Sequence, residues 1–143
     1  MYYHQPDGNG NWSSTVIATS PDNYVAGDGP KGTGFSPSLR FDARGRAHIV
    51  FLDHAGEHFG GIGQQEYAGN VRHGWWNGNS WSFETLYSQT APLQQEAVYP
   101  AFALSQNELA LTFLQRDTQW NLGSFPPLSN SKYYFRFLTR SLP

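Results

Sequence analysis

Short runs of apolar or alternating residues recur along the chain, and turn-forming residues separate them. The clearest runs are Ser38 to Phe41 and Ala47 to Leu52, which flank the turn at residues 42–45 (DARG). Apolar, β-branched and aromatic residues on both sides of a glycine-bearing turn are typical of a β-hairpin. The pattern therefore predicts a hairpin over residues 38–52 and, along the whole chain, strands rather than helices.

Three more hairpins and a final strand follow the same pattern. Two of their turns hold Asp-Gly or Asn-Gly pairs, which tolerate the positive φ that a tight hairpin needs. These hairpins are predicted at residues 2–18, 71–86 and 100–114, and the last strand at 133–138. Polar or Gly- and Pro-rich segments predict loops at 19–36, 53–69, 87–99 and 115–131, with room for one helical turn in 89–98.

The predicted strands repeat. The segment from Tyr2 to Trp12 aligns with the segment from Val71 to Trp81 at an offset of 69 residues, which places His4 on His73. Two further alignments have offsets of 63 and 62 residues, namely 37–39 with 100–102 and 51–52 with 113–114. Such self-similarity indicates a repeat architecture. With four strands, a to d, in a unit of about 60–70 residues, the chain reads c-d, a-b-c-d, a-b-c.

The segments PSLRFDARGRAHIVFLD and VRHGWWNGNSWSFETL resemble the repeats of bacterial BNR and sialidase-like β-propellers. The resemblance implies an all-β fold of antiparallel four-stranded blades, about two per chain, in one domain of residues 1–143. The Asp-box pattern S-x-D-x-G-x-T-W is not met, because Asp42 and Gly45 give only D-x-x-G and the second copy has Ser105 and Asn107. The arginine triad and the tyrosine nucleophile of sialidases have no counterparts that can be assigned in this sequence.

The number of blades bears on assembly. Propellers usually contain four or more blades, and two readings follow for a chain with about two. Several copies assemble, and three copies would supply six blades. Alternatively, the chain is a fragment or an open sheet that covers its own edges. Because open sheet edges promote aggregation, we favour a homo-oligomer, and a trimer in particular.

The composition argues against two classes of partner. The net charge is −2 and the nine Lys and Arg residues are scattered, whereas nucleic-acid binding usually requires a basic patch. No apolar run approaches the roughly 18 residues of a membrane span. We therefore predict neither a nucleic-acid partner nor a membrane partner. The N-terminus has no signal-peptide pattern, so the protein is either cytoplasmic or secreted with its leader removed.

Two adjacent tryptophans are the best candidate for a ligand site. Neighbouring residues on a strand face opposite sides, so one of Trp75 and Trp76 is expected to pack between blades while the other is exposed. An exposed Trp can stack on a sugar ring, and Arg72, Asn77 and Glu84 could supply hydrogen bonds. Alternatively, both tryptophans belong to the core, as we expect for Trp12, Trp81 and His48.

A second candidate lies in the predicted loop 53–69. Asp53, His54, Glu57 and His58 include the spelling H-x-x-E-H, which in zinc hydrolases requires a helix that brings both His to one face. No helical period follows here, so we predict no zinc enzyme and assign no metal and no cofactor. A weak loop metal site at these residues is the alternative.

Together these patterns favour non-catalytic ligand binding, with a glycan as the expected ligand. One alternative is a glycoside hydrolase or polysaccharide lyase of the BNR type, which would need a pair of carboxyl groups at a defined separation. Another is a purely structural or assembly protein. The sequence leaves the question of enzymatic activity open, because it cannot place the carboxyl groups relative to one another.

Overall fold

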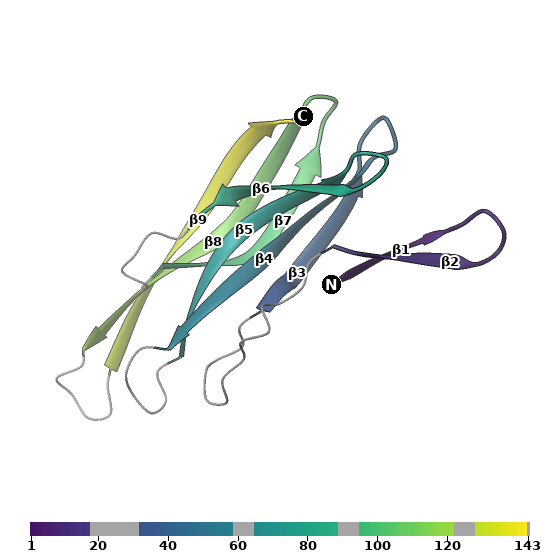
Figure 1. Ribbon diagram of the computed structural model, residues 1–143. Helices are drawn as coiled ribbons and strands as arrows, with labels where there is room; N and C mark the ends of the chain where they lie inside the picture. Colours follow the sequence, from purple (N-terminus) through teal and green to yellow (C-terminus); the bar gives the residue numbers. More distant parts are fainter. Residues whose placement is uncertain (18–31, 59–64, 89–94, 122–127, 143) are drawn as a thin grey trace.

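The computed structural model describes residues 1–17, 32–58, 65–88, 95–121 and 128–142. Within them the chain forms antiparallel strands and no helix (Figure 1), which confirms the all-β prediction. The strands are β1 (Tyr2–Pro6), β2 (Trp12–Val16), β3 (Gly32–Phe41), β4 (Ala47–His58), β5 (Gln65–Trp76), β6 (Trp81–Tyr87), β7 (Gln95–Leu104), β8 (Glu108–Asn121) and β9 (Leu128–Ser141).

Each sheet is made of strands that follow one another in sequence. The sheets have the orders β1-β2, β3-β4-β5-β6 and β7-β8-β9. Side-chain hydrogen bonds fix their turns. In the turn between β3 and β4, one carboxylate oxygen of Asp42 accepts the backbone N–H groups of Arg44 and Arg46, and Gly45 adopts a φ of 76°. The polar residues at this turn therefore connect consecutive strands without a long loop.

Most strands extend beyond their predicted ends. The predicted loop 53–69 is wrong at both of its ends, because β4 continues to His58 and β5 begins at Gln65. These strands stay paired over this whole length, from His48 opposite Trp75 to His58 opposite Gln65. Backbone hydrogen bonds do not depend on side-chain polarity, so two paired strands can continue through polar residues. The same reason applies to residues 95–98, which are strand and not helix.

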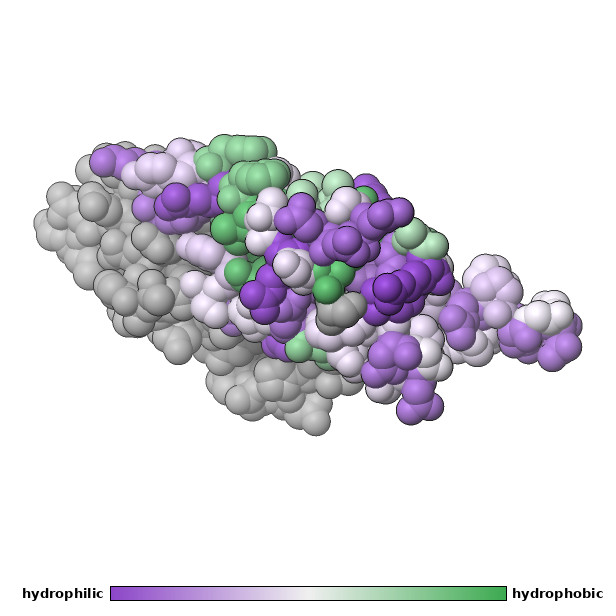
Figure 2. Space-filling model, turned by 90° about the horizontal axis from the view of Figure 1, so that it is seen from above, coloured by the Kyte–Doolittle hydropathy of each residue, from purple (hydrophilic) through white to green (hydrophobic). Residues whose placement is uncertain are grey.

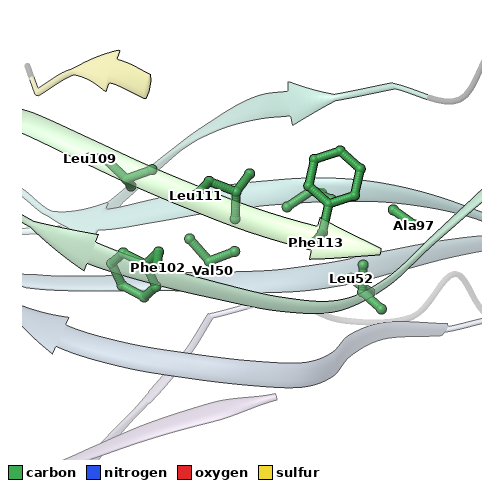
Figure 3. Close-up of a cluster of buried hydrophobic side chains, with 8 residues drawn as sticks. Val50, Leu52, Ala97, Phe102, Leu109, Leu111 and Phe113 are labelled. Carbon is green, nitrogen blue, oxygen red and sulfur yellow. The ribbon is translucent and has the colours of Figure 1, made fainter. Parts of the chain in front are cut away.

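The main core lies between the two larger sheets. Leu109, Leu111 and Phe113 alternate along β8 and point towards Val50 and Leu52 of β4 (Figure 3). This period of two places one face of β8 in the core from Leu109 to Phe113. The buried cluster consists of Val50, Leu52, Val71, Ala97, Phe102, Leu109, Leu111 and Phe113. Full burial of such a side chain contributes about 1.5–3 kcal/mol, so this cluster holds the two sheets together.

The hairpin β1-β2 contacts the opposite face of the four-stranded sheet and projects from the body (Figures 1 and 2). At its base, Ile17 is buried against Ile49 and Phe51, and the ring of Tyr3 meets Trp81 edge-on at 5.4 Å. Trp12 lies at the far end of the hairpin and is 69% exposed. The prediction that Trp12 is a packing anchor within the chain is therefore wrong, because the hairpin extends past the sheet that it contacts.

The described part of the chain does not close on itself. Its sheets remain separate in hydrogen bonding, and they form neither a barrel nor a ring. They follow one another as two, four and three strands. Nor do the described residues include a helix that is long and apolar enough to cross a lipid bilayer.

Candidate functional site

A row of polar side chains runs between the two larger sheets. His48 of β4 and His73 of β5 are fully buried, and their rings stack with centroids 5.2 Å apart. His48 lies opposite Trp75 and His73 opposite Val50, so the two histidines are diagonal neighbours on one face of the sheet. His48 Nδ1 lies 2.9 Å from His73 Nε2.

A carboxylate lies at each end of the histidine pair. His73 Nδ1 is 3.0 Å from Glu84 Oε1, and His48 Nε2 is 3.4 Å from Asp42 Oδ2. Each carboxylate also contacts an arginine. Arg46 Nε is 2.7 Å from Asp42, and Arg140 of β9 is 3.0 Å from Glu84. The row therefore crosses the four-stranded sheet and connects it to the neighbouring sheet.

The distances assign the protons of the pair. A neutral imidazole donates through one nitrogen and accepts through the other, so two neutral histidines can make two of the three contacts. His48 Nδ1–H donates to His73 Nε2, and His73 Nδ1–H donates to Glu84. The contact left without a proton is then His48 Nε2 with Asp42, which is also the longest.

Burial favours the neutral form of the two histidines. Loss of hydration lowers the pKa of His48, although the hydrogen bond that a protonated His48 would donate to Asp42 and the negative charge of Asp42 act in the opposite direction. The pKa of His73 is lowered for the same main reason. The hydrogen bond that His73 donates to Glu84 acts against this lowering, whereas His48 and Arg140 lower the pKa further. Loss of hydration outweighs the carboxylates because a buried imidazolium cannot recover its hydration energy.

Asp42 stays ionised. Burial raises the pKa of its carboxyl group, but the backbone N–H of Arg46, the Arg46 guanidinium and the backbone N–H of Arg44 outweigh this and lower the pKa to about 2. A carboxyl group with such a pKa does not donate a proton near neutral pH. The polar row therefore has structural rather than acid–base character at this end.

The candidate sugar-binding residues lie on two different faces of the four-stranded sheet. Trp75 is on the face that carries the histidines, and its ring centroid is 5.3 Å from that of His73. Trp76 is on the opposite face, with its ring centroid 5.9 Å from that of Trp81. Both tryptophans are half-buried. The strand thus separates them as the alternation rule requires, and one ligand cannot stack on both.

The three polar candidates are also separated. Arg72 shares the face of Trp76 and contacts Asp53 at 3.3 Å. Glu84 is on the face of Trp75 and binds His73 and Arg140. Asn77 lies in the turn between β5 and β6, where its side-chain oxygen accepts two backbone N–H groups. These candidates do not converge on one site.

A half-buried aromatic strip lies on the Trp76 face. Trp76, Trp81 and Phe83 follow one another across β5 and β6, with ring centroids 5.9 and 6.5 Å apart. Gly74 lies beneath Phe83, and a Cβ atom at this position would be 2.6 Å from the Phe83 ring. The guanidinium of Arg72 lies 6.0 Å from the centroid of the same ring. The strip therefore ends at the polar pair formed by Arg72 and Asp53.

The candidate metal ligands lie at the end of β4. Asp53 accepts a hydrogen bond from Arg72. His54, Glu57 and His58 follow on the same strand, and their side chains lie outside the described part of the structure. The strand does not provide the helix that an H-x-x-E-H zinc site requires. Among the described side chains, no group of His, Asp and Glu is arranged to hold a metal ion.

Sequence reasoning did not find the polar row. It assigned His48 to the core, which the structure confirms, and it aligned His73 with His4 without recognising its partner. A signal was present, because a His within the apolar strand 47–52 needs a buried hydrogen-bond partner.

Searches of protein-family models, of curated proteins and of solved structures find no match to this chain.

Proposed function

We propose that the protein is a non-catalytic glycan-binding protein whose sheets are blades of a BNR-type β-propeller completed by further copies of the chain. The observation that carries the glycan proposal is the half-buried Trp76 in the aromatic strip on β5 and β6. Sugar rings present apolar C–H faces that stack on such side chains, and a few polar groups at the edge of an apolar surface fix the orientation of a ligand.

Trp76 is the member of the aromatic strip that a sugar could reach. Trp81 and Phe83 pack against the cluster beneath the hairpin β1-β2, where the ring of Tyr3 meets Trp81. Arg72 and Asp53 at the end of the strip offer donors and acceptors for sugar hydroxyl groups. Trp76 is the principal stacking residue in this arrangement, and Trp75 is a packing residue on the other face.

The blade proposal is supported by the grouping of the strands. The sheets contain two, four and three strands in sequence order, as in the c-d, a-b-c-d, a-b-c reading of the repeat. The four-stranded and three-stranded sheets also stack face to face through an apolar core, which is how neighbouring blades pack. In this proposal, three copies of the chain make up one closed ring.

The glycosidase alternative receives less support from the described carboxyl groups. Such an enzyme needs one carboxyl group that stays protonated as a general acid. The pKa of Asp42 is about 2, and Glu84 is bound to both His73 and Arg140. Neither group is arranged for this role.

A fluorescence titration tests the glycan proposal, with sialyllactose, chitotriose and cellotetraose as probes. We expect at least one sugar to change the tryptophan emission of the wild type, and Trp76→Ala to abolish this response. Trp75→Ala is the matched control, since it also removes one tryptophan from β5 but from the other face, and it should still respond. If no sugar acts, or if Trp75→Ala alone removes the response, the proposal is wrong.

A further inference from the structure

A cavity of about 200 Å³ lies beside the main core, at one side of the contact between the two larger sheets. β7 packs against β3, β4 and β5, and the cavity lies next to this contact, where β6 faces β8 and β9. Leucines from these three strands and one arginine line it. They are Leu86 of β6, Leu109 and Leu111 of β8, and Leu138 and Arg140 of β9.

A β-bulge in β6 builds one wall of the cavity. Tyr87 lies opposite Val71 and Thr85 lies opposite Arg72, so Leu86 is an extra residue on its strand. Both Leu86 and Tyr87 pack against the core cluster, although neighbouring residues of a regular strand would face opposite sides. The bulge therefore turns one more apolar side chain towards the space between the sheets.

The cavity has a charged end and an apolar end. Arg140 lies opposite Leu109, and Leu138 lies opposite Leu111. Residues directly opposite each other on paired strands share a face, so Arg140 and Leu138 are on the side of the two buried leucines. The two pairs are two residues apart along the strands, which is a separation of roughly 7 Å. A ligand that follows the strands would meet the guanidinium at one end and leucines at the other.

Arg140 can serve a second acceptor. Its Nε and Nη2 atoms both lie 3.0 Å from the same oxygen, Glu84 Oε2, and the other oxygen of Glu84 contacts His73. A guanidinium has five N–H donors, so this contact leaves the edge formed by Nη1 and Nη2. The side chain of Arg140 is 62% exposed, and a ligand can therefore approach this edge from solvent.

The chemistry of this edge favours a carboxylate. Its two parallel N–H groups match the two oxygens of a carboxylate, and such a bidentate pair is among the stronger polar contacts in proteins. A cationic head group would be repelled by Arg140. A doubly charged phosphate would be repelled by the nearby Glu84, which already accepts from Arg140.

We propose that this cavity binds a short aliphatic carboxylate, whose alkyl chain lies among Leu86, Leu111 and Leu138 and whose carboxylate pairs with Arg140. The volume sets the length of the chain. An apolar cavity of roughly 150 Å³ takes up benzene, so about 200 Å³ has room for an alkyl chain of about six carbons. The inference goes beyond the glycan proposal and is independent of it, because Trp76 is on the opposite face of the four-stranded sheet.

An NMR titration of the wild-type chain with hexanoate tests the site. We expect saturable shifts of the backbone signals of Leu86 and Leu138 and of the Nε–H signal of Arg140. Hexan-1-ol has the same chain without the carboxylate, and we expect it to bind in the same place at least about tenfold more weakly, since hydrogen bonds between charged groups are lost. The proposal is wrong if hexanoate causes no saturable shift at these residues, or if hexan-1-ol binds equally well.

Substitutions separate the two ends of the cavity. Arg140→Gln should weaken hexanoate by about tenfold or more and leave hexan-1-ol unchanged. Arg136→Gln is the matched control, because Arg136 is on the same face of β9, opposite Phe113, and is not part of the lining. Leu138→Phe fills the apolar end and should exclude both compounds.

Arg140→Lys covers the case in which loss of the contact with Glu84 disturbs the fold. It keeps the positive charge but lacks the two-pronged edge, so it should also weaken hexanoate. Circular dichroism shows whether the sheets of each variant are formed. If folded Arg140→Lys and Arg140→Gln bind hexanoate as tightly as the wild type and Arg136→Gln, Arg140 does not hold the carboxylate and the inference is overturned.

Discussion

The buried histidines His48 and His73 should make the protein sensitive to mild acid. Burial holds both pKa values below their usual 6.5 in the folded protein. In the unfolded chain both side chains are hydrated and take up protons as the pH falls through 6.5. Below this pH the unfolded state binds more protons than the folded state, so the free energy of unfolding must decrease.

The magnitude follows from the number of buried imidazoles. A histidine that stays neutral when folded costs about 1.4 kcal/mol of stability at about pH 5.5, and two cost at most about 3 kcal/mol. Asp42 faces the pair and does not titrate in this range, because its pKa is about 2. Arg46, Arg140 and Glu84 are the other charged groups beside the pair.

Urea unfolding at about pH 7.5 and about pH 5.5 measures the effect. We expect the wild type to lose up to about 3 kcal/mol between these pH values, and His73→Gln to lose about half as much. His4→Gln is the control, because His4 is the repeat counterpart of His73 and lies exposed on β1. The other titratable residues are the same in all variants, so their contributions to the pH-dependent loss of stability cancel when the variants are compared. A wild type whose stability is constant or increases towards pH 5.5 would refute the reasoning, since the pair would then hold an additional proton in the folded state.

Two further changes test the packing and the turn. Gly74→Ala places a Cβ atom 2.6 Å from the ring of Phe83. We expect this substitution to lower the free energy of unfolding in urea by about 1–3 kcal/mol. An unchanged free energy of unfolding would contradict the close contact. Asp42→Asn removes a carboxylate whose pKa in the folded protein lies below its pKa in the unfolded chain. The variant should therefore be less stable at neutral pH, and it should lose less stability than the wild type between about pH 4 and pH 2. Acid titration followed by circular dichroism measures both effects, and a variant that loses as much stability as the wild type over this range would exclude a stabilising role of the Asp42 carboxylate.

The hairpins could be predicted because their turns are encoded locally. The carboxylate of Asp42 and the glycine at position 45 act within a few residues of each other, so the turn is visible in a short window of sequence. The inward face of β8 was not assigned from the sequence, although Leu109, Leu111 and Phe113 alternate with the smaller Ala110 and Thr112. Both signals are short-range.

The longer-range features were not visible. The continuation of β4 to His58 depends on β5 lying alongside it, and the sequence of β4 alone reads as a loop there. The polar row depends on His48 and His73, which are 25 positions apart. The exposure of Trp12 depends on where the sheet beneath the hairpin ends. Each of these follows from tertiary pairing, which no local pattern encodes.

The polar row also has a consequence for how the sheet selects its strand alignment. β4 ends and β5 begins in a polar, glycine-containing segment, and strands of this kind can slide past each other at little energetic cost. A slip of one residue would turn His73 to the other face and leave His48 buried without its partner. The cost of an unpaired buried imidazole, about 1–3 kcal/mol, therefore falls on alignments that are shifted by one residue. The histidine pair thus disfavours sheets in which β4 and β5 pair one residue out of register.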